Sequence, residues 1–218
     1  MNKKIIAILG DAGHDHDILL GKLNSVVQAK LQGCELQDIA PEKLAIALLA
    51  CPDILVLSKM NSLPEKDADG HPLVWLSPDW ESRLASYVAA GGCLVVWHSG
   101  LYGYPGDGKM IELMGGHFFH KPPALLNVTY STVAGTPMSL GVASFEVLDE
   151  HYQVACDPQV VDVFLKSSSA EGESPAGWSR IYGKGRVCYL AAPHPTNKVV
   201  PEFDELMALC LQWCAENN

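Results

Sequence analysis

The sequence has 218 residues, with 25 acidic against 15 basic side chains, a formal net charge of −10 and an isoelectric point near 5.1. This balance excludes a nucleic-acid-binding protein, because phosphate recognition requires a basic surface. A chain of this length can bury the core of one domain, so we expect a single domain over residues 1–218.

The N-terminal residues do not have the pattern of a targeting segment, since Lys4 is followed directly by a short apolar run. No apolar run is long enough to cross a membrane. The seven cysteines form no CxxC motif and several lie in apolar runs, which is typical of reduced, buried thiols. These features predict a cytoplasmic protein that binds no membrane.

The first half of the chain alternates predicted strands with predicted helices, because apolar runs ending in turn formers are followed by segments of helical periodicity. Strands are expected over residues 3–10, 53–59 and 93–99. Helices are expected over residues 17–31, 41–50 and 78–90. Between them, the Pro-, Asp- and Gly-rich segment 62–78 is expected to be a loop.

The second half is richer in predicted strands. These are expected over residues 124–133, 143–155 and 160–167. A hairpin over residues 178–192 and a helix over residues 203–214 complete the chain, and the Ser- and Gly-rich segment 167–177 is predicted to be a mobile loop. The pattern as a whole predicts an α/β fold: a mostly parallel sheet with helices on both faces and extra β-hairpins in the second half.

Most of the eight histidines come shortly after a predicted strand. His14 and His16 follow the first predicted strand, His98 ends the third, and His194 follows the last. His117 and His120 lie in the segment GGHFFHKPP, and His151 follows Asp149 and Glu150. The carboxyl ends of parallel strands meet at one edge of a sheet, and ligands bind there. We therefore expect several of these rings to share a cleft despite their separation in the sequence.

Three kinds of chemistry could use such a cluster. Imidazoles together with a carboxylate bind transition metals, and catalytic zinc takes about three protein ligands and one water. An imidazole can also act as a general acid or base without a metal. Ser99 could be a nucleophile, but its surroundings, Trp-His-Ser-Gly-Leu, lack the Gly-x-Ser-x-Gly pattern of a nucleophile elbow.

Each candidate also has a structural explanation. His14 and His16 could serve as loop and capping residues of the following helix, and His98 could simply donate to a backbone carbonyl. Glu150 is either a solvated turn residue or a carboxylate that orients a histidine. His120 precedes Lys-Pro-Pro in a rigid loop, which makes it a better candidate than the histidine three residues before it.

Four ordered blocks of the sequence are distinctive: GGCLVVWHSG, ELMGGHFFHKPP, FEVLDEHYQV and GWSRIYGKGRVCYLAAPH. In this order they resemble the ThuA-like family, named from trehalose utilisation, over most of the chain up to His194. The resemblance implies a class I glutamine amidotransferase-like, flavodoxin-like fold. It does not imply amidotransferase activity, because His98 and Ser99 occupy the elbow and Cys93 lies five residues too early.

The family pattern falls on four residues that we interpret as catalytic: His98, His120, Glu150 and His194. We expect His98 and His120 to act as base or ligand, Glu150 to orient a ring, and His194 to act as acid or ligand. The cofactor is not specified by the sequence. A divalent transition metal such as zinc would suit His98, His120 and His194 as its ligands.

The same resemblance indicates residues that would contact the substrate. His14 or His16 lies in the first loop of the family pattern, and Arg180 lies in its hairpin. Tyr102 and Trp178 could stack on a sugar face, although Trp178 is equally well explained as a core residue. These five residues form the predicted substrate-binding set.

The resemblance implies an enzyme of carbohydrate utilisation that hydrolyses or isomerises a glycoside, or a trehalose-like 3-keto glycoside, in a His-lined cleft. A base would remove the proton next to the keto group, a cation or an imidazolium would hold the enolate, and the glycosidic substituent would leave. The alternative is a non-catalytic sugar-binding or regulatory module on the same fold. The expected partner is a small-molecule sugar, and a homo-oligomer is compatible with the sequence.

Overall fold

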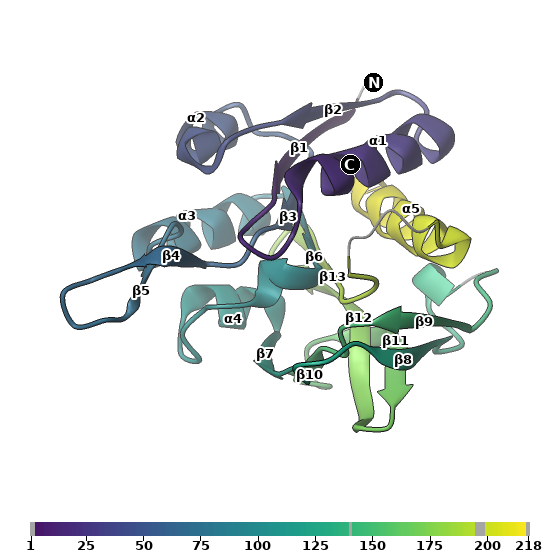
Figure 1. Ribbon diagram of the computed structural model, residues 1–218. Coiled ribbons are helices and arrows are strands. Elements are labelled where there is room, and N and C mark those ends of the chain that lie inside the picture. Colours follow the sequence, from purple (N-terminus) through teal and green to yellow (C-terminus); the bar gives the residue numbers. More distant parts are fainter. Residues whose placement is uncertain (1–2, 140, 195–198, 217–218) are drawn as a thin grey trace.

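The computed structural model describes residues 3–139, 141–194 and 199–216. The described part is built around a sheet of nine strands in the order β2-β1-β3-β6-β13-β12-β11-β8-β9 (Figure 1). The first five strands in this order are parallel. They are β2 (Cys34–Asp38), β1 (Lys3–Leu9), β3 (Ile54–Ser58), β6 (Cys93–Trp97) and β13 (Gly185–Leu190). The predicted mixed α/β fold is confirmed.

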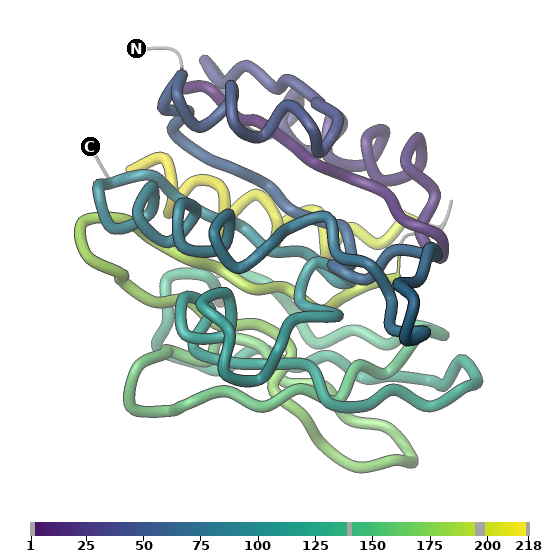
Figure 2. The backbone as a smooth tube through the Cα atoms, turned by 90° about the vertical axis from the view of Figure 1, so that its left-hand side faces the viewer, coloured from purple at the N-terminus to yellow at the C-terminus, as the bar shows by residue number. Residues whose placement is uncertain are grey.

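Helices cover both faces of the parallel strands, which explains why β3 and β6 are buried along their whole length. One face is covered by α1 (His16–Lys30) and α5 (Pro201–Ala215), and the other by α3 (Pro78–Ala89) and α4 (Lys109–Met114). The short η1 (Pro41–Lys43) and α2 (Leu44–Leu49) lie on the same side as α3. Figure 2 shows the yellow α5 returning to lie beside the first half of the chain.

Four antiparallel strands extend the sheet on the far side of β13. They are β12 (Gly172–Tyr182), β11 (Asp162–Ser169), β8 (Leu126–Thr132) and β9 (Phe145–Asp149). Two antiparallel ribbons complete the described strands. They pair β7 (Gly116–His120) with β10 (Gln153–Cys156), and β4 (Ser62–Lys66) with β5 (Pro72–Val74).

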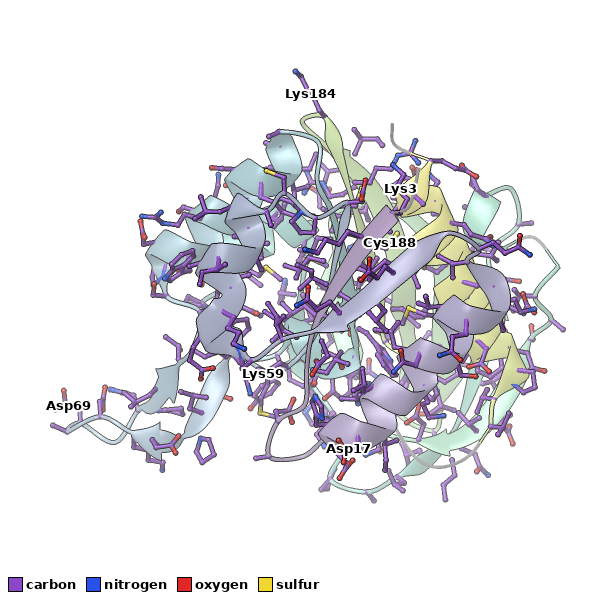
Figure 3. All side chains as sticks on the ribbon, turned by 90° about the horizontal axis from the view of Figure 1, so that it is seen from above. Lys3, Asp17, Lys59, Asp69, Lys184 and Cys188 are labelled. Atoms are coloured by element: carbon purple, nitrogen blue, oxygen red, sulfur yellow. The ribbon has the colours of Figure 1, made fainter. Side chains whose placement is uncertain are left out.

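Two predicted loops are corrected by the structure. Segment 167–177 is part of the β11–β12 hairpin rather than a mobile loop, because Ser167 and Ser174 are buried and bond to neighbouring strands. Segment 62–78 contains the β4–β5 ribbon, which projects from the body with Asp69 at its tip (Figure 3). Serine, glycine and proline were typical of loops in both segments, but tertiary pairing decides their structure.

Three elements, β2, α4 and β7, have no counterpart among the predicted elements. Alternating polar residues in β2 place it at the exposed edge of the sheet, where a strand has little apolar signal. Residues 143–155, predicted as one strand, form β9 and β10 in two different sheets. The break between them, residues 150–152, is where Glu150 is presented to the sheet edge.

The core is continuous from the parallel strands into the antiparallel extension. All seven cysteines lie in the described residues and are unbridged, and four of them, including Cys188 (Figure 3), are buried. This agrees with their prediction as small apolar side chains. None of the helices among the described residues is long and apolar enough to cross a membrane.

Candidate functional site

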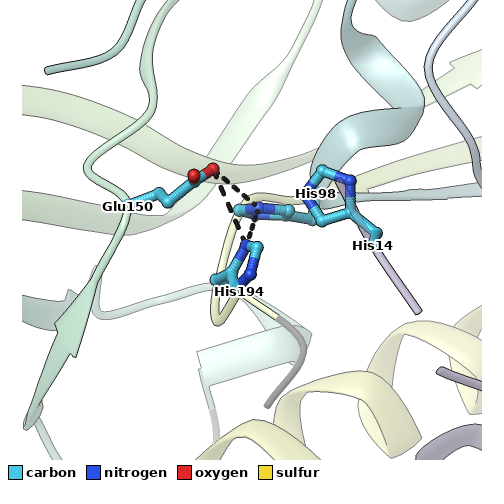
Figure 4. Close-up of side chains that lie close together, drawn as sticks. All are labelled: His14, His98, Glu150 and His194. Carbon is cyan, nitrogen blue, oxygen red and sulfur yellow. Dashed lines mark hydrogen bonds and ion pairs between the residues drawn. The ribbon is translucent and has the colours of Figure 1, made fainter. Parts of the chain in front are cut away.

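Four side chains converge at the carboxyl edge of the parallel strands. His14 follows β1, His98 follows β6, His194 lies beyond β13, and Glu150 follows β9 (Figure 4). The ligand atoms that these side chains offer all lie within 4.8 Å of one another. No other group of this kind was found among the described residues.

His98 is fixed by its backbone and by one hydrogen bond. It is fully buried and has a positive φ of 49°, where the chain turns from β6 into the short helix η2 (His98–Leu101). The turn also requires Gly100, because a Cβ there would lie 2.3 Å from the Leu57 carbonyl oxygen. His98 Nδ1 donates to the Ala191 carbonyl oxygen at 2.6 Å. In the neutral ring Nε2 therefore carries a lone pair that faces the cluster.

The orientation of the His14 ring is fixed by a hydrogen bond to a carboxylate. Its Nδ1 lies 2.6 Å from Asp11 Oδ1, and its Nε2 is buried without a hydrogen-bond partner. Burial alone would raise the pKa of Asp11, but the hydrogen bond and charge of His14, with bonds from Met60 and Ser99, hold that pKa well below its usual value. Asp11 is thus an ionised acceptor, and His14 Nδ1 carries the proton.

Glu150 and His194 complete the cluster. Glu150 Oε2 lies 3.6 Å from both His98 Nε2 and His194 Nδ1, and His194 Nδ1 lies 3.3 Å from His98 Nε2. Burial raises the pKa of Glu150, but His98 and Lys121 outweigh that effect and hold the pKa at about 2. Burial, helped by the neighbouring His98, lowers the pKa of His194 to about 4. At neutral pH both side chains therefore offer lone pairs.

The donor set of this cluster fits a divalent transition metal. His14 Nε2 and Glu150 Oε2 are buried and have no hydrogen-bond partner, although burial of an unpaired polar atom is costly. Three imidazole nitrogens and one carboxylate oxygen are ligands that suit zinc and related divalent metals. A cation at their centre would satisfy atoms that no protein donor reaches. Of the three predicted metal ligands, His98 and His194 belong to the cluster and His120 lies outside it, whereas His14 and Glu150 are the two additional members.

The cluster borders a pocket of about 460 Å³. Its wall contains a row of aromatic rings in which Tyr152 contacts Phe118 at 5.0 Å and Phe118 contacts Tyr102 at 4.9 Å between centroids. Behind this wall the buried His98 ring stacks on Tyr152 at 4.1 Å. Polar side chains face the same space. The polar and charged residues of the lining are His14, Ser62, Tyr102, His120, Lys121, Glu150 and Tyr152.

Some of the predicted substrate-binding residues line this pocket and others do not. Tyr102 and His14 line the pocket, as does His120, which lies outside the metal-binding group. His16 does not line it: its ring is exposed at the start of α1 and bonds to Asp17 and Asp38.

Trp178 and Arg180, which were also predicted to contact the substrate, do not line this pocket. Trp178 is fully buried and donates from Nε1 to the Met114 carbonyl oxygen, so it has no exposed face for a sugar. Arg180 donates from Nη1 to the carbonyl oxygens of Glu112 and Leu113, near the end of α4. There it stabilises a helix terminus and lines a different pocket, of about 550 Å³.

Several residues of the site were missed by the sequence analysis. Asp11 follows the first strand, as His14 does, and the same edge rule would have selected it. Lys121 forms an ion pair with Glu150, and Tyr152 lies two residues after Glu150 in a segment predicted as continuous strand. Only the break between β9 and β10 shows that Tyr152 borders the cluster.

Comparisons with known proteins agree with this fold. A ThuA-like protein from Parabacteroides merdae ATCC 43184 has a TM-score of 0.72 at 13% identity, covering 99% of this chain and 91% of that chain. A ThuA-like protein from Bacteroides uniformis ATCC 8492 has a TM-score of 0.70 at 16% identity, with coverages of 97% and 90%. A β-galactosidase from Bacillus circulans sp. alkalophilus has a TM-score of 0.67 at 14% identity, covering 97% of this chain and 31% of that chain.

These identities are low, so the structural likenesses establish the fold alone. No curated protein sequence matches the chain. The family model described as ThuA, trehalose utilisation, matches residues 47–214, which is well over half of the sequence. The chain therefore belongs to the ThuA family of trehalose utilisation.

Proposed function

We propose that this protein is a metal-assisted enzyme of carbohydrate utilisation that hydrolyses or isomerises a glycoside, with a trehalose-like 3-keto glycoside as the preferred substrate. The observation that carries the proposal is the convergence of four ligand atoms within 4.8 Å beside a pocket of about 460 Å³. Membership of a trehalose-utilisation family supports a sugar as the ligand.

His14, His98, Glu150 and His194 would hold the metal. Bound there, a divalent metal would act as a Lewis acid and draw negative charge onto a sugar oxygen. The ammonium of Lys121, which pairs with Glu150 in the pocket wall, adds positive charge at the same place. The aromatic wall, with Tyr102 and Phe118, offers an apolar surface to the sugar ring.

His120 is the histidine of the pocket that lies outside the cluster, and we assign it the role of base. It takes the proton from the carbon between the keto group and the anomeric carbon. The electron pair of that C–H bond moves onto the keto oxygen as an enolate. When the carbonyl forms again, the pair makes a double bond to the anomeric carbon, whose bond to the glycosidic oxygen breaks. The departing oxygen takes the proton back from His120.

Addition of water across the new double bond then completes hydrolysis. Return of the proton to the opposite face of the same carbon, without loss of the substituent, would instead give the isomer. The two outcomes share the first step, so the same residues serve either reaction.

The test measures bound metal in the purified protein and turnover of trehalose and of 3-keto trehalose, before and after treatment with a chelator. His98→Gln should abolish metal-dependent turnover, whereas His71→Gln, in an exposed turn, should not change it. Undiminished turnover in His98→Gln would overturn the proposal. Sugar binding without turnover in the metal-loaded wild type would favour the non-catalytic sugar-binding module instead.

A further inference from the structure

We infer that Asp11 is a positioning residue that fixes the tautomer and direction of His14, and so delivers the His14 Nε2 lone pair to the cluster. The inference rests on the proposed metal site for its functional meaning, but its structural content can be measured without a metal. Asp11 was absent from every candidate drawn from the sequence.

Asp11 is buried and accepts from four donors with two oxygens. Its Oδ1 accepts from the Gly13 amide at 3.0 Å and from His14 Nδ1 at 2.6 Å. Its Oδ2 accepts from the Met60 amide at 3.0 Å and from the Ser99 hydroxyl at 2.8 Å. Only 3% of its side-chain surface is exposed, so the carboxylate is satisfied mainly by these protein donors.

These bonds join three loops at the carboxyl edge of the sheet. Gly13 and His14 belong to the loop after β1, Met60 to the segment after β3, and Ser99 to the turn after β6. Three of these residues, Gly13, His14 and Met60, line the pocket, and Ser99 directly follows His98. A single carboxylate therefore sets the relative positions of two candidate ligands and of one pocket wall.

The carboxylate also decides which nitrogen of His14 is protonated. An ionised carboxylate can only accept, so Nδ1 must donate and Nε2 must be unprotonated in the neutral ring. His14 Nε2 is buried and unpartnered, while the rings of His98 and His194 lie 5.0 and 4.9 Å from the His14 ring between centroids. A carboxylate behind a ligating histidine orients the ring and raises its basicity.

Asparagine at position 11 cannot reproduce this arrangement. Its single oxygen could face either the Gly13 and His14 side or the Met60 side, and its amide group would then oppose a backbone N–H on the other side. With the amide toward His14, Nδ1 would become the acceptor and Nε2 would carry the proton. Asp11→Asn should therefore reverse the tautomer of His14 in part or all of the molecules.

The first measurement is the protonation of His14 in metal-free wild-type protein above pH 7, from long-range ¹H–¹⁵N correlations assigned by their loss in His14→Gln. We expect a proton on Nδ1 and none on Nε2. A proton on Nε2 in the wild type would overturn the inference, and this result needs no variant to fold.

The second measurement is the affinity for Zn²⁺ or Co²⁺. Asp11→Asn should weaken it ~10- to 100-fold, whereas Asp17→Asn, at an exposed aspartate near the same loop, should leave it unchanged. In the His14→Gln background, Asp11→Asn should add less than a twofold loss, because Asp11 acts through His14. An equal loss in both backgrounds would mean that Asp11 only supports the loops, and would overturn the inference.

The two proposals can fail separately. If the wild type binds neither ion and turns over no sugar, the proposed function fails, while the His14 tautomer still decides the role of Asp11. If metal binds but the tautomer is reversed, the role of Asp11 fails and the metal site stands.

Discussion

Two pockets flank the β7–β10 ribbon and differ in what their polar groups do. The larger, of about 550 Å³, contains Glu112, Asp157 and Arg180. Its two carboxylates accept from the Tyr182 hydroxyl and the Gln159 amide, and Arg180 Nη1 donates to a carbonyl oxygen of α4. The smaller, of about 460 Å³, borders ligand atoms that converge without a donor between them, including those of His14 and Glu150. Unsatisfied buried acceptors, and not volume, therefore distinguish the candidate site.

The largest expected effect comes from removing a ligand charge. Glu150→Gln keeps the shape of the side chain but removes the anion, so metal affinity should fall more than ~100-fold, since losing a residue that only orients a ligand already costs ~10- to 100-fold. Turnover should fall with it. Calorimetric titration and steady-state kinetics measure both. Glu112→Gln makes the same change in the larger pocket and should alter neither; equal losses in the two variants would erase the distinction between the pockets.

A second matched pair tests the assigned base. His120→Gln should lower kcat for the keto glycoside by ~10²- to 10⁴-fold, the usual value of a general base, and should leave metal affinity unchanged. His117→Gln, three residues earlier on β7 and lining the larger pocket, should leave kcat at the wild-type value. If His120→Gln retains full activity, another group is the base.

The pH dependence of stability should separate a buried histidine from an exposed one. The pKa of His194 lies at about 4 in the folded protein, below its ordinary 6.5, so between these values the unfolded chain binds a proton that the folded chain does not. The free energy of unfolding of the metal-free protein should therefore fall as the pH falls from 6.5 to 4. His194→Gln should flatten this slope by at most ~1.4 kcal/mol per pH unit.

His16 provides the control, with the opposite sign. Hydrogen bonds to Asp17 and Asp38 raise its pKa, so its contribution is present at low pH and is lost as the pH rises above 6.5. Denaturant unfolding at several pH values checks both variants. A change in the slope of stability against pH below pH 6.5 in His16→Gln, or no change in that slope in His194→Gln, would contradict the assigned environments.

The smallest effect on function is expected in the larger pocket. Arg180→Met removes the donor to the last carbonyl oxygens of α4 and should cost about 1–2 kcal/mol of stability. Metal affinity and KM for the sugar should not change. Thermal unfolding measures the stability, and steady-state kinetics measures KM. A large rise in KM would mean that Arg180 contacts the substrate.

Much of the fold could be predicted from the sequence because its signals are local. The apolar runs of β1, β3, β6 and β13 and the helical periodicity of α1 and α5 mark buried strands and amphipathic helices wherever they occur. The edge strand β2 and the strand β7 have no such signal. Their conformation depends on neighbours that are distant in the sequence.

The candidate site was predictable only as far as strand ends are predictable. His98 and His194 follow apolar strands that the sequence marks plainly, so the sequence by itself determined that polar groups would gather at one edge of the sheet. Which groups meet was decided by the tertiary structure. The break after β9 brings in Glu150, and the bond to Asp11 turns His14 inward. His16, only two residues further on, lies outside, because the direction of a side chain depends on contacts that no local pattern contains.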